Sequence, residues 1–347
     1  MICYYEIMKN NYKAWDVDYQ LFYGQRTLAE QLGFLIKFAV LAPSSHNSQP
    51  WKLSVRENKI SIMPDFNRRL AASDQNDRQL YISLGCCLEN ILTAADYYGF
   101  KTSVQYQMDN NDVLEISISF GQLPADNRSD KHNIFCIARR RTNRRKYENY
   151  LPEEFLNSIK NYSASDINVN IVCEQKLKNQ IADTVISAIQ SAMNDKAFRK
   201  ELSSYVKPNF TSSPFGMPGS GFGMPAPFSV IAPYVMRHFN INKITSKQDK
   251  RLLAEFTPAM AIISTKNDNA ESWIKAGQMY EKIALEAENN NINTHVMAAA
   301  IQIGDYYQNL QKITGSAFRP QVFFRVGRSL NAAPRSPRLN ETEVIKS

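Results

Sequence analysis

Residues 39–53 read AVLAPSSHNSQPWKL. The apolar start of this stretch has the character of a helix end, and Pro43 prevents a helix from continuing. Five polar residues follow at 44–48, and Gln-Pro-Trp then leads into a strand-like segment. A simple turn needs fewer hydrogen-bonding groups than this. We therefore interpret the loop as one wall of a cofactor pocket whose other wall lies elsewhere in the chain.

The composition is that of a soluble globular protein. Of 347 residues, 44% are hydrophobic and 21% charged, which is enough for one large domain or two ordinary ones. No run of about 18 apolar residues predicts a membrane span, and the N-terminal residues lack the pattern of a secretory signal. The five cysteines are scattered without a CxxC pair, and the histidines show no metal spacing. We expect reduced thiols, a cytoplasmic location, no membrane partner and no metal.

Hydrophobic periodicity in the first half predicts two helices and four strands. The helices are expected at 27–41 and 81–98, and the strands at 52–56, 59–63, 102–108 and 113–120. Residues 1–26 show little periodicity and are interpreted as an extension packed on the surface.

The second half repeats the scheme of helix, strands, long helix and strand. Its expected elements are a short helix after Pro152, strands at 167–173, 259–265 and 321–326, and helices at 175–193, 270–289 and 296–312. We therefore predict an α+β fold of two related halves that form an internal pseudo-dimer around mixed β-sheets with flanking helices. The predicted boundaries are 1–26 for the extension, 27–125 and 126–338 for the halves, and 339–347 for a C-terminal tail.

A basic segment at 139–146, RRRTNRRK, has six basic residues among eight. On a helical turn, Arg140 and Arg144 would share a face, and their guanidinium groups would suit a phosphate through bidentate bonds. A solvated run of charge and a nucleic-acid patch are the alternatives. No aromatic residues alternate with these arginines, which argues against nucleic acid.

Residues 207–227, KPNFTSSPFGMPGSGFGMPAP, hold five of the 15 prolines and four of the 13 glycines. A structureless segment of about 20 residues inside a compact domain is uncommon unless it covers a site or is disordered. We interpret it as a lid over the pocket, with a disordered surface loop as the alternative.

Together, Pro43-Ser44-Ser45-x-Asn47-x-Gln49-Pro50-Trp51 and Arg140-Arg141-Thr142-x-Arg144 resemble the nitroreductase family of flavin-binding proteins. In that family the arginine motif usually precedes the Pro-Ser motif, whereas here the order is inverted. Ordinary members are homodimers that bind flavin at their interface. The inverted order resembles the duplicated Acg-like subgroup, in which one chain supplies both halves, so a monomer or weak homodimer is expected. The resemblance covers most of residues 27–338.

The resemblance implies a role for each matching residue. Arg140 would hold the phosphate arm of FMN, and Arg141 would also contact the cofactor. Thr142 stands where the family has Ser, and Arg144 would lie near the flavin ring. The flavin edge would contact the Pro-Ser residues Pro43, Ser44, Ser45, Asn47 and Gln49, although Gln49 also suits a purely structural role. A late basic pair, Arg335 and Arg338, would reach the phosphate, and Arg325 or Arg328 could substitute for it. His46 is interpreted as a loop residue and Trp51 as a packing wall, and no side chain is assigned as catalytic.

The resemblance implies an FMN-dependent oxidoreductase that uses NAD(P)H as a transient reductant. Its acceptors would be nitroaromatics, quinones or similar small molecules. The alternative is a protein that stores or sequesters FMN under a lid with little turnover. A nucleic-acid partner is not expected.

Overall fold

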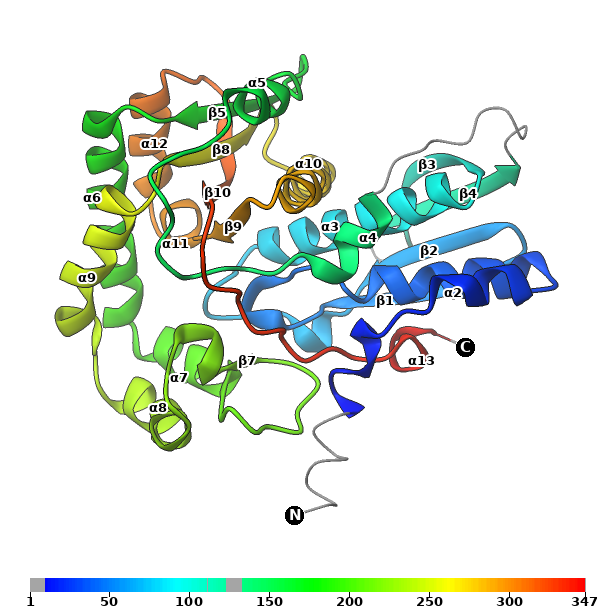
Figure 1. Cartoon of the computed structure of the whole chain (residues 1–347), viewed down its shortest axis with the longest axis horizontal. Helices are drawn as coiled ribbons and strands as arrows, with labels where there is room; N and C mark the ends of the chain where they lie inside the picture. The colour runs from blue at the N-terminus through cyan, green and yellow to red at the C-terminus, as the bar shows by residue number, and fades with distance from the viewer. Residues whose placement is uncertain (1–9, 111, 123–132, 347) are drawn as a thin grey trace.

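The computed structural model describes residues 10–110, 112–122 and 133–346. It contains two four-stranded sheets separated by a pair of long helices (Figure 1). The α+β prediction is confirmed.

The first sheet has the order β1-β2-β4-β3, and all of its strand pairs are antiparallel. The β1–β2 hairpin has only two residues, Glu57 and Asn58, between its strands, and so short a connection requires antiparallel pairing. Glu57 adopts a φ of 52°, in the left-handed region that such tight turns use. The strands are β1 (Trp51–Arg56), β2 (Lys59–Pro64), β3 (Phe100–Met108) and β4 (Leu114–Gln122).

Two helices pack with this sheet, α2 (Leu28–Ala39) and α3 (Arg78–Tyr97). Thr27 and Glu30 form a reciprocal capping box that begins α2. The N-terminal extension was expected to pack on the surface, but part of it is buried in the core. Trp15 and Phe22 are 3% and 6% exposed and belong to the main core, because their rings cover apolar surface that α2 and the sheet leave open. Residues 1–9 of the extension lie outside the described residues.

The second sheet has the order β5-β8-β10-β9 and is also antiparallel within its named strands. Alternate residues of its central strands serve two cores: Ala261 and Ile263 face the main core, whereas Met260 and Ile262 face a second cluster with α6. The strands are β5 (Ile167–Val172), β8 (Ala259–Thr265), β9 (Asn293–Val296) and β10 (Arg319–Gly327). Its principal helices are α5 (Glu153–Lys160), α6 (Gln175–Asn194) and α10 (Ala270–Asn289).

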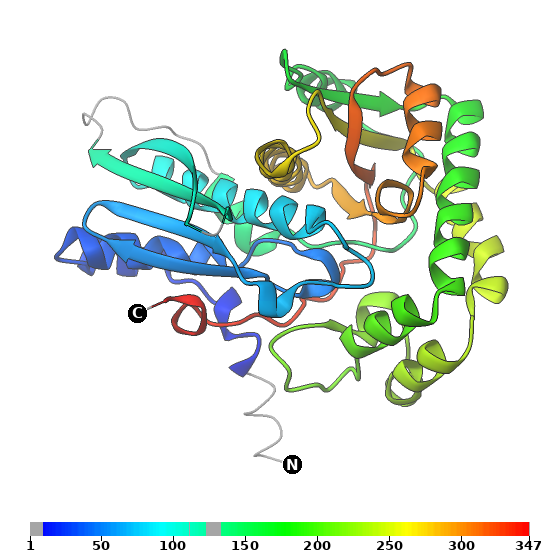
Figure 2. The ribbon, with the colours of Figure 1, turned by 180° about the vertical axis from the view of Figure 1, so that it is seen from behind.

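The two sheets share one topology. If the four strands of each sheet are numbered by their position along the chain, their order across the sheet is first, second, fourth, third. In both sheets a long helix precedes the third strand: α3 before β3 and α10 before β9. These two helices pack against each other between the sheets (Figures 1 and 2). The repetition is that of two related halves. The prediction of mixed sheets is corrected by the structure, because both four-stranded sheets are antiparallel. Among the described residues, parallel pairing is confined to the short strands β6 (Val206–Lys207) and β7 (Met217–Pro218) and to the isolated bridges Leu53–Ile345 and Thr142–Thr294.

The long helix expected at 296–312 is broken. The chain instead forms β9, then α11 (Ala299–Gln302) and α12 (Tyr306–Thr314), with Gly304 at φ 45° between the two helices. Segment 207–227 is not structureless. It contains β7 (Met217–Pro218), a 3-10 turn at Gly219–Phe222 and the start of α8 (Ala226–His238). Further helices that were not predicted include α7 (Lys196–Tyr205) and α9 (Asn242–Glu255).

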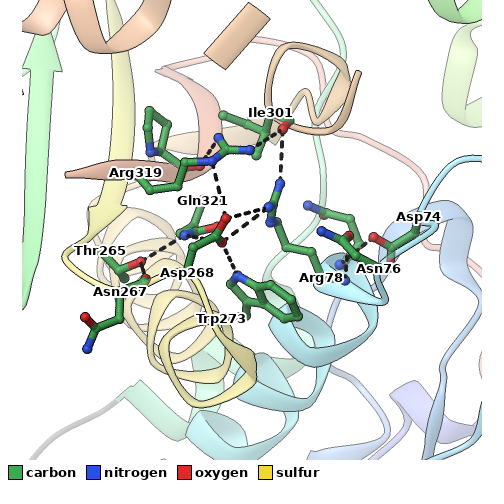
Figure 3. Close-up of polar contacts among 12 residues, drawn as sticks. Asp74, Asn76, Arg78, Thr265, Asn267, Asp268, Trp273, Ile301, Arg319 and Gln321 are labelled. Carbon is green, nitrogen blue, oxygen red and sulfur yellow. Dashed lines mark hydrogen bonds and ion pairs between the residues drawn. The ribbon is translucent and has the colours of Figure 1, made fainter. Parts of the chain in front are cut away.

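A polar cluster joins the halves at the beginning of α3 (Figure 3). The Asp268 carboxylate accepts both contacts from Nη2 of Arg78, at 3.1 and 3.2 Å. Gln321 and Trp273 donate to the same carboxylate at 3.1 and 2.6 Å. Arg78 and Arg319 also donate to the Ile301 carbonyl at 3.2 and 3.3 Å. The cluster ties the first half to α11 and β10 of the second.

Candidate functional site

Two neighbouring cavities lie where the halves meet. The larger has a volume of about 320 Å³ and the smaller about 70 Å³. Their shared wall consists of Pro43, Ser44, His46, Thr142, Arg144 and Met217. The two stretches that the sequence singles out, about a hundred residues apart, therefore line one composite site.

The Pro-Ser loop (residues 43–49) is held in an unusual conformation. His46, Asn47 and Gln49 have φ values of 53°, 56° and 52°, which cost non-glycine residues about 1 kcal/mol or more each. Side-chain contacts to distant segments compensate. Asn47 Nδ2 donates to the carbonyls of Gly216 and Pro337 at 3.0 and 2.9 Å. The loop conformation is thus specified by the surrounding chain.

Gln49 stabilises the loop from behind. Its Nε2 donates to the Pro214 carbonyl at 2.8 Å, and its Oε1 accepts from the Leu339 amide at 2.9 Å. The side chain is completely buried and lines neither cavity. This geometry agrees with a structural role for Gln49 and places its side chain outside both cavities.

The arginine segment (residues 139–146) is not a helical turn. Helix α4 (Asn133–Arg139) ends where the segment begins, and Thr142 forms a parallel bridge to Thr294 of β9. In an extended chain, every second side chain lies on the same side. Arg140, Thr142 and Arg144 therefore share a side because they are two residues apart, and not because residues four apart share the face of a helix. All three line the small cavity, and Arg141 lines it as well.

Arg140 has a counter-charge that its sequence neighbours do not reveal. Its Nε lies 3.0 Å from Oε1 of Glu281 on α10, and both side chains are almost fully buried. Burial alone would lower the pKa of Arg140, but the Glu281 carboxylate raises it, so the guanidinium remains charged. Arg140 also donates to the Leu41 carbonyl at 3.3 Å. Much of its binding capacity is therefore used within the protein.

Arg338 and Arg144 are two further cations that line the small cavity. Arg338 is 4% exposed, and its Nη1 donates to Asn47 Oδ1 at 2.5 Å. Burial and the neighbouring Arg140 together lower the pKa of Arg338 to about 9, although Glu281 acts in the opposite direction. Burial lowers the pKa of Arg144 to about 10. Among the described residues, neither arginine is ion-paired with a carboxylate.

Several polar atoms at the site are buried without a hydrogen-bond partner. They are Nε of Arg141 and Arg338, Nη1 of Arg140 and Nε2 of His46. Buried donors are normally satisfied, and an unpaired buried cation is costly. An anion with several acceptor oxygens in the small cavity would satisfy the guanidinium groups, which is the donor set expected for a phosphate.

The larger cavity is mainly apolar. Its apolar wall includes Ile82, Ile189, Phe198, Leu202, Met297 and Val322. Two histidines also line it, and burial lowers the pKa of His46 to about 4 and that of His295 well below its usual range. Both rings are therefore neutral at physiological pH. The cavity suits an apolar ring system with a few polar groups along one edge.

The predicted site residues can be grouped by the cavity that they line. Those lining the small cavity are Pro43, Ser44, Asn47, Arg140, Arg141, Thr142, Arg144 and Arg338, and Ser45 lines only the large one. Arg335 lines neither cavity and lies 3.5 Å from Asp16. The suggested substitutes, Arg325 and Arg328, line neither cavity. Arg325 is buried against Thr257 and the Arg145 carbonyl, and Arg328 pairs with Glu148 at 3.9 Å.

Sequence reasoning missed many residues that line the cavities, among them Trp15, Met217, Tyr280 and His295. Trp15 lines the small cavity, and its ring lies 4.8 Å from the Arg338 guanidinium carbon. Met217 lines both cavities, whereas Tyr280 and His295 line the large one. Of these four, Met217 had a signal in the sequence, since it belongs to the 207–227 segment that was interpreted as a lid.

The 207–227 segment lies against the site, as the lid interpretation requires. The Gly216 amide donates to the Asn47 carbonyl at 3.2 Å, and the Phe222 ring lies 4.6 Å from the Arg144 guanidinium carbon. Whether the segment opens stays a prediction. Among the described residues, no helix is long and apolar enough to cross a membrane, and no cluster of side chains could hold a metal ion.

Comparison with known proteins places this site in context. No family model matches the chain. Putative NAD(P)H nitroreductase Rv3131 of Mycobacterium tuberculosis is 24% identical over 328 residues, which is 92% of each chain. Putative NAD(P)H nitroreductase acg of the same organism is 22% identical over 297 residues, covering 84% of this chain and 87% of acg. The chain is similar to these two putative nitroreductases over most of its length.

The similarity to Rv3131 extends over both sheets, because the match spans nearly the whole of both proteins. One solved structure with a likeness to the chain is the FMN and NADPH-dependent nitroreductase NfnB from sphigopyxis sp. strain HMH. It is 15% identical, with a TM-score of 0.43, and the match covers 62% of this chain and 99% of NfnB.

Proposed function

We propose that this nitroreductase relative binds FMN across the two cavities and uses it to pass electrons from NAD(P)H to a small-molecule acceptor. The main support for this proposal is the difference in polarity between the two cavities. An apolar chamber of about 320 Å³ adjoins a polar one lined by four arginines. A planar ring joined to a phosphate combines the same two chemistries. The names of the mycobacterial relatives support the nicotinamide part of the proposal.

The guanidinium groups would hold the phosphate. Arg338 and Arg141 each present a buried, unpartnered Nε, and Arg144 adds a charge that no described carboxylate neutralises. Arg140 would contribute its unpartnered Nη1, while its Nε stays paired with Glu281. This revises the role inferred from the sequence, in which Arg140 was the principal phosphate ligand.

The remaining walls would position the ring. Ser44 and Ser45 bring hydroxyl and backbone groups to its edge, and Met217 and Ile82 supply apolar contact. Bound FMN would supply the redox chemistry, the transfer of hydride equivalents from NAD(P)H to a nitroaromatic, a quinone or a similar acceptor. The chain itself supplies binding and orientation, and its neutral histidines can hydrogen-bond without adding charge.

Stopped-flow mixing tests this function. The purified protein, reconstituted with FMN, is mixed anaerobically with NADH or with NADPH, and the flavin absorbance is followed. Bleaching by one of them within seconds, followed by reoxidation with a nitroaromatic or quinone, supports the proposal. A flavin that is bound but bleached by neither nucleotide contradicts it.

That second outcome is expected if the protein stores or sequesters FMN instead. The observation that favours storage is the close attachment of the 207–227 segment to the Pro-Ser loop, through Asn47 to Gly216 and Gln49 to Pro214. Dithionite reduction separates the two functions when the wild type is compared with a variant whose residues 209–216 are replaced by a short glycine-serine linker. A large acceleration in the variant supports a closed lid, whereas equal rates contradict it.

We also propose that the two halves, with boundaries at 27–125 and 126–338, form the complete site within one chain. Its walls include residues of the first half, such as Ser44, and of the second, such as Arg144 and Arg338. A monomer in solution that binds one FMN would support this arrangement, and it can be measured by light scattering coupled to gel filtration.

A further inference from the structure

Helix α8 presents its large apolar side chains outward. Phe228, Val230, Ile231 and Tyr234 are 50–65% exposed, whereas its buried residues are the small Ser229 and Ala232. A helix on the surface of a globular protein normally shows the opposite arrangement. Figures 1 and 2 show α8 beside α7 at the periphery, away from both sheets.

The exposed residues form one patch rather than scattered contacts. Phe228, Ile231 and Tyr234 follow at intervals of three and therefore lie along one side of the helix. Phe239, just after the helix end, is 58% exposed and adds a further apolar ring in this region. Contiguous apolar surface of this kind marks an interaction site.

The surrounding charge indicates what the patch binds. Residues 202–248 contain no Asp or Glu but four basic residues, Lys207, Arg237, Lys243 and Lys247. Arg237 is exposed on the last turn of α8, and Lys247 is exposed on α9. Two copies joined through α8 would bring these like charges together, which disfavours self-association. An anionic surface would attract them.

We propose that α8 docks onto an anionic lipid surface. Phe228, Ile231 and Tyr234 would enter the boundary between headgroups and acyl chains, and Arg237 would meet lipid phosphates. Aromatic and aliphatic side chains combined with basic residues are the composition of helices that lie in this interface. No membrane partner was expected because the sequence has no membrane-spanning segment. A helix that lies on the membrane surface does not require such a segment.

Docking would bring the site close to the lipid. The inner face of α8 packs through Ala232 against Val206 and Met217. Met217 lines both cavities, so a single layer of side chains separates the docked helix from the site. The proposal does not depend on flavin binding, because it rests on α8 and its charge alone.

Co-sedimentation of the full-length protein with lipid vesicles tests the proposal. The vesicles contain phosphatidylcholine alone or mixed with phosphatidylglycerol. We expect binding to the anionic vesicles that weakens as salt is added, because the basic residues are screened. The double variant Phe228→Ser/Ile231→Ser should bind at least about tenfold more weakly, and Arg237→Glu should also bind less well.

The matched control is Tyr150→Ser/Leu330→Ser, which removes two side chains that are 72% and 79% exposed elsewhere on the surface. It should bind like the wild type, and thermal unfolding should confirm that all variants are folded. Absence of wild-type binding, or equal binding by the α8 double variant, would overturn the proposal. So would self-association in ultracentrifugation without vesicles that the α8 double variant abolishes, because the patch would then cover a second copy.

Discussion

Gly85 of α3 and Gly277 of α10 occupy reciprocal positions where the two long helices cross. A Cβ on Gly85 would lie 2.0 Å from the carbonyl oxygen of Ile274, and a Cβ on Gly277 would lie 2.0 Å from that of Ile82. In each case the blocked carbonyl belongs to the residue three before the opposite glycine. The crossing therefore has the symmetry of a dimer contact within one chain.

Alanine at either glycine should destabilise the protein. The added methyl group would collide with backbone, which cannot rotate away, so we expect a loss of about 3 kcal/mol in urea unfolding, at the upper end of the usual cost of overpacking. Gly33→Ala in α2 is the control, because a Cβ at this position would have no neighbouring atom within 4 Å. That variant should be neutral or slightly more stable. A small effect of Gly85→Ala would contradict so close a crossing of the two helices.

The Arg140–Glu281 pair should behave as a buried ion pair. Arg140→Met leaves the Glu281 carboxylate buried without its counter-charge and should cost about 3–5 kcal/mol in the free energy of unfolding. Glu281→Leu should cost a similar amount. The double variant should recover most of the loss, and a double-mutant cycle in urea measures this. Additive losses would show that the two groups do not interact.

Arg144 and Arg338 should determine FMN affinity. Replacing either one by alanine removes an anion contact, and a charge-assisted hydrogen bond contributes about 1.5–3 kcal/mol, or roughly tenfold to a hundredfold in affinity. Quenching of FMN fluorescence measures the change. Arg328→Ala is the control, since this side chain is exposed and pairs with Glu148. Unchanged affinity in both site variants would place the phosphate elsewhere.

Glu89 should make stability depend on pH. Burial raises the pKa of Glu89 to about 7, although Lys282 lowers it. The folded state therefore holds this proton more tightly than the unfolded state, and stability is lost as the pH rises from about 4.5 to about 7. Glu89→Gln removes this loss, so the variant should gain stability relative to wild type over the same range. Parallel curves of unfolding free energy against pH would contradict the assignment.

The sequence was informative where local physics decides the structure. Thr27 and Glu30 form the cap that the start of a helix requires, and Glu57-Asn58 is short enough to define a hairpin. The Pro-Ser loop and the arginine segment could be matched because each is continuous in sequence. Their separation also indicated that one chain supplies both walls.

Other features depend on contacts that no local pattern reveals. Arg140 has no acid nearby in sequence, and only the packing of α10 brings Glu281 to it. Trp15 reaches the site because its indole Nε1 donates to the carbonyl of Ser336, 321 residues away. Helix α8 was missed because its apolar residues face outward, so its pattern does not describe a core-facing helix.

The composite site is tested by comparing FMN with riboflavin, which has the same ring but no phosphate. Isothermal titration of the flavin-free protein with each compound isolates the contribution of the small cavity. Two or more guanidinium contacts to the phosphate predict FMN binding at least about a hundredfold tighter than riboflavin, with the difference reduced in Arg338→Ala. Equal affinity for the two flavins, or binding of neither, would contradict the composite site.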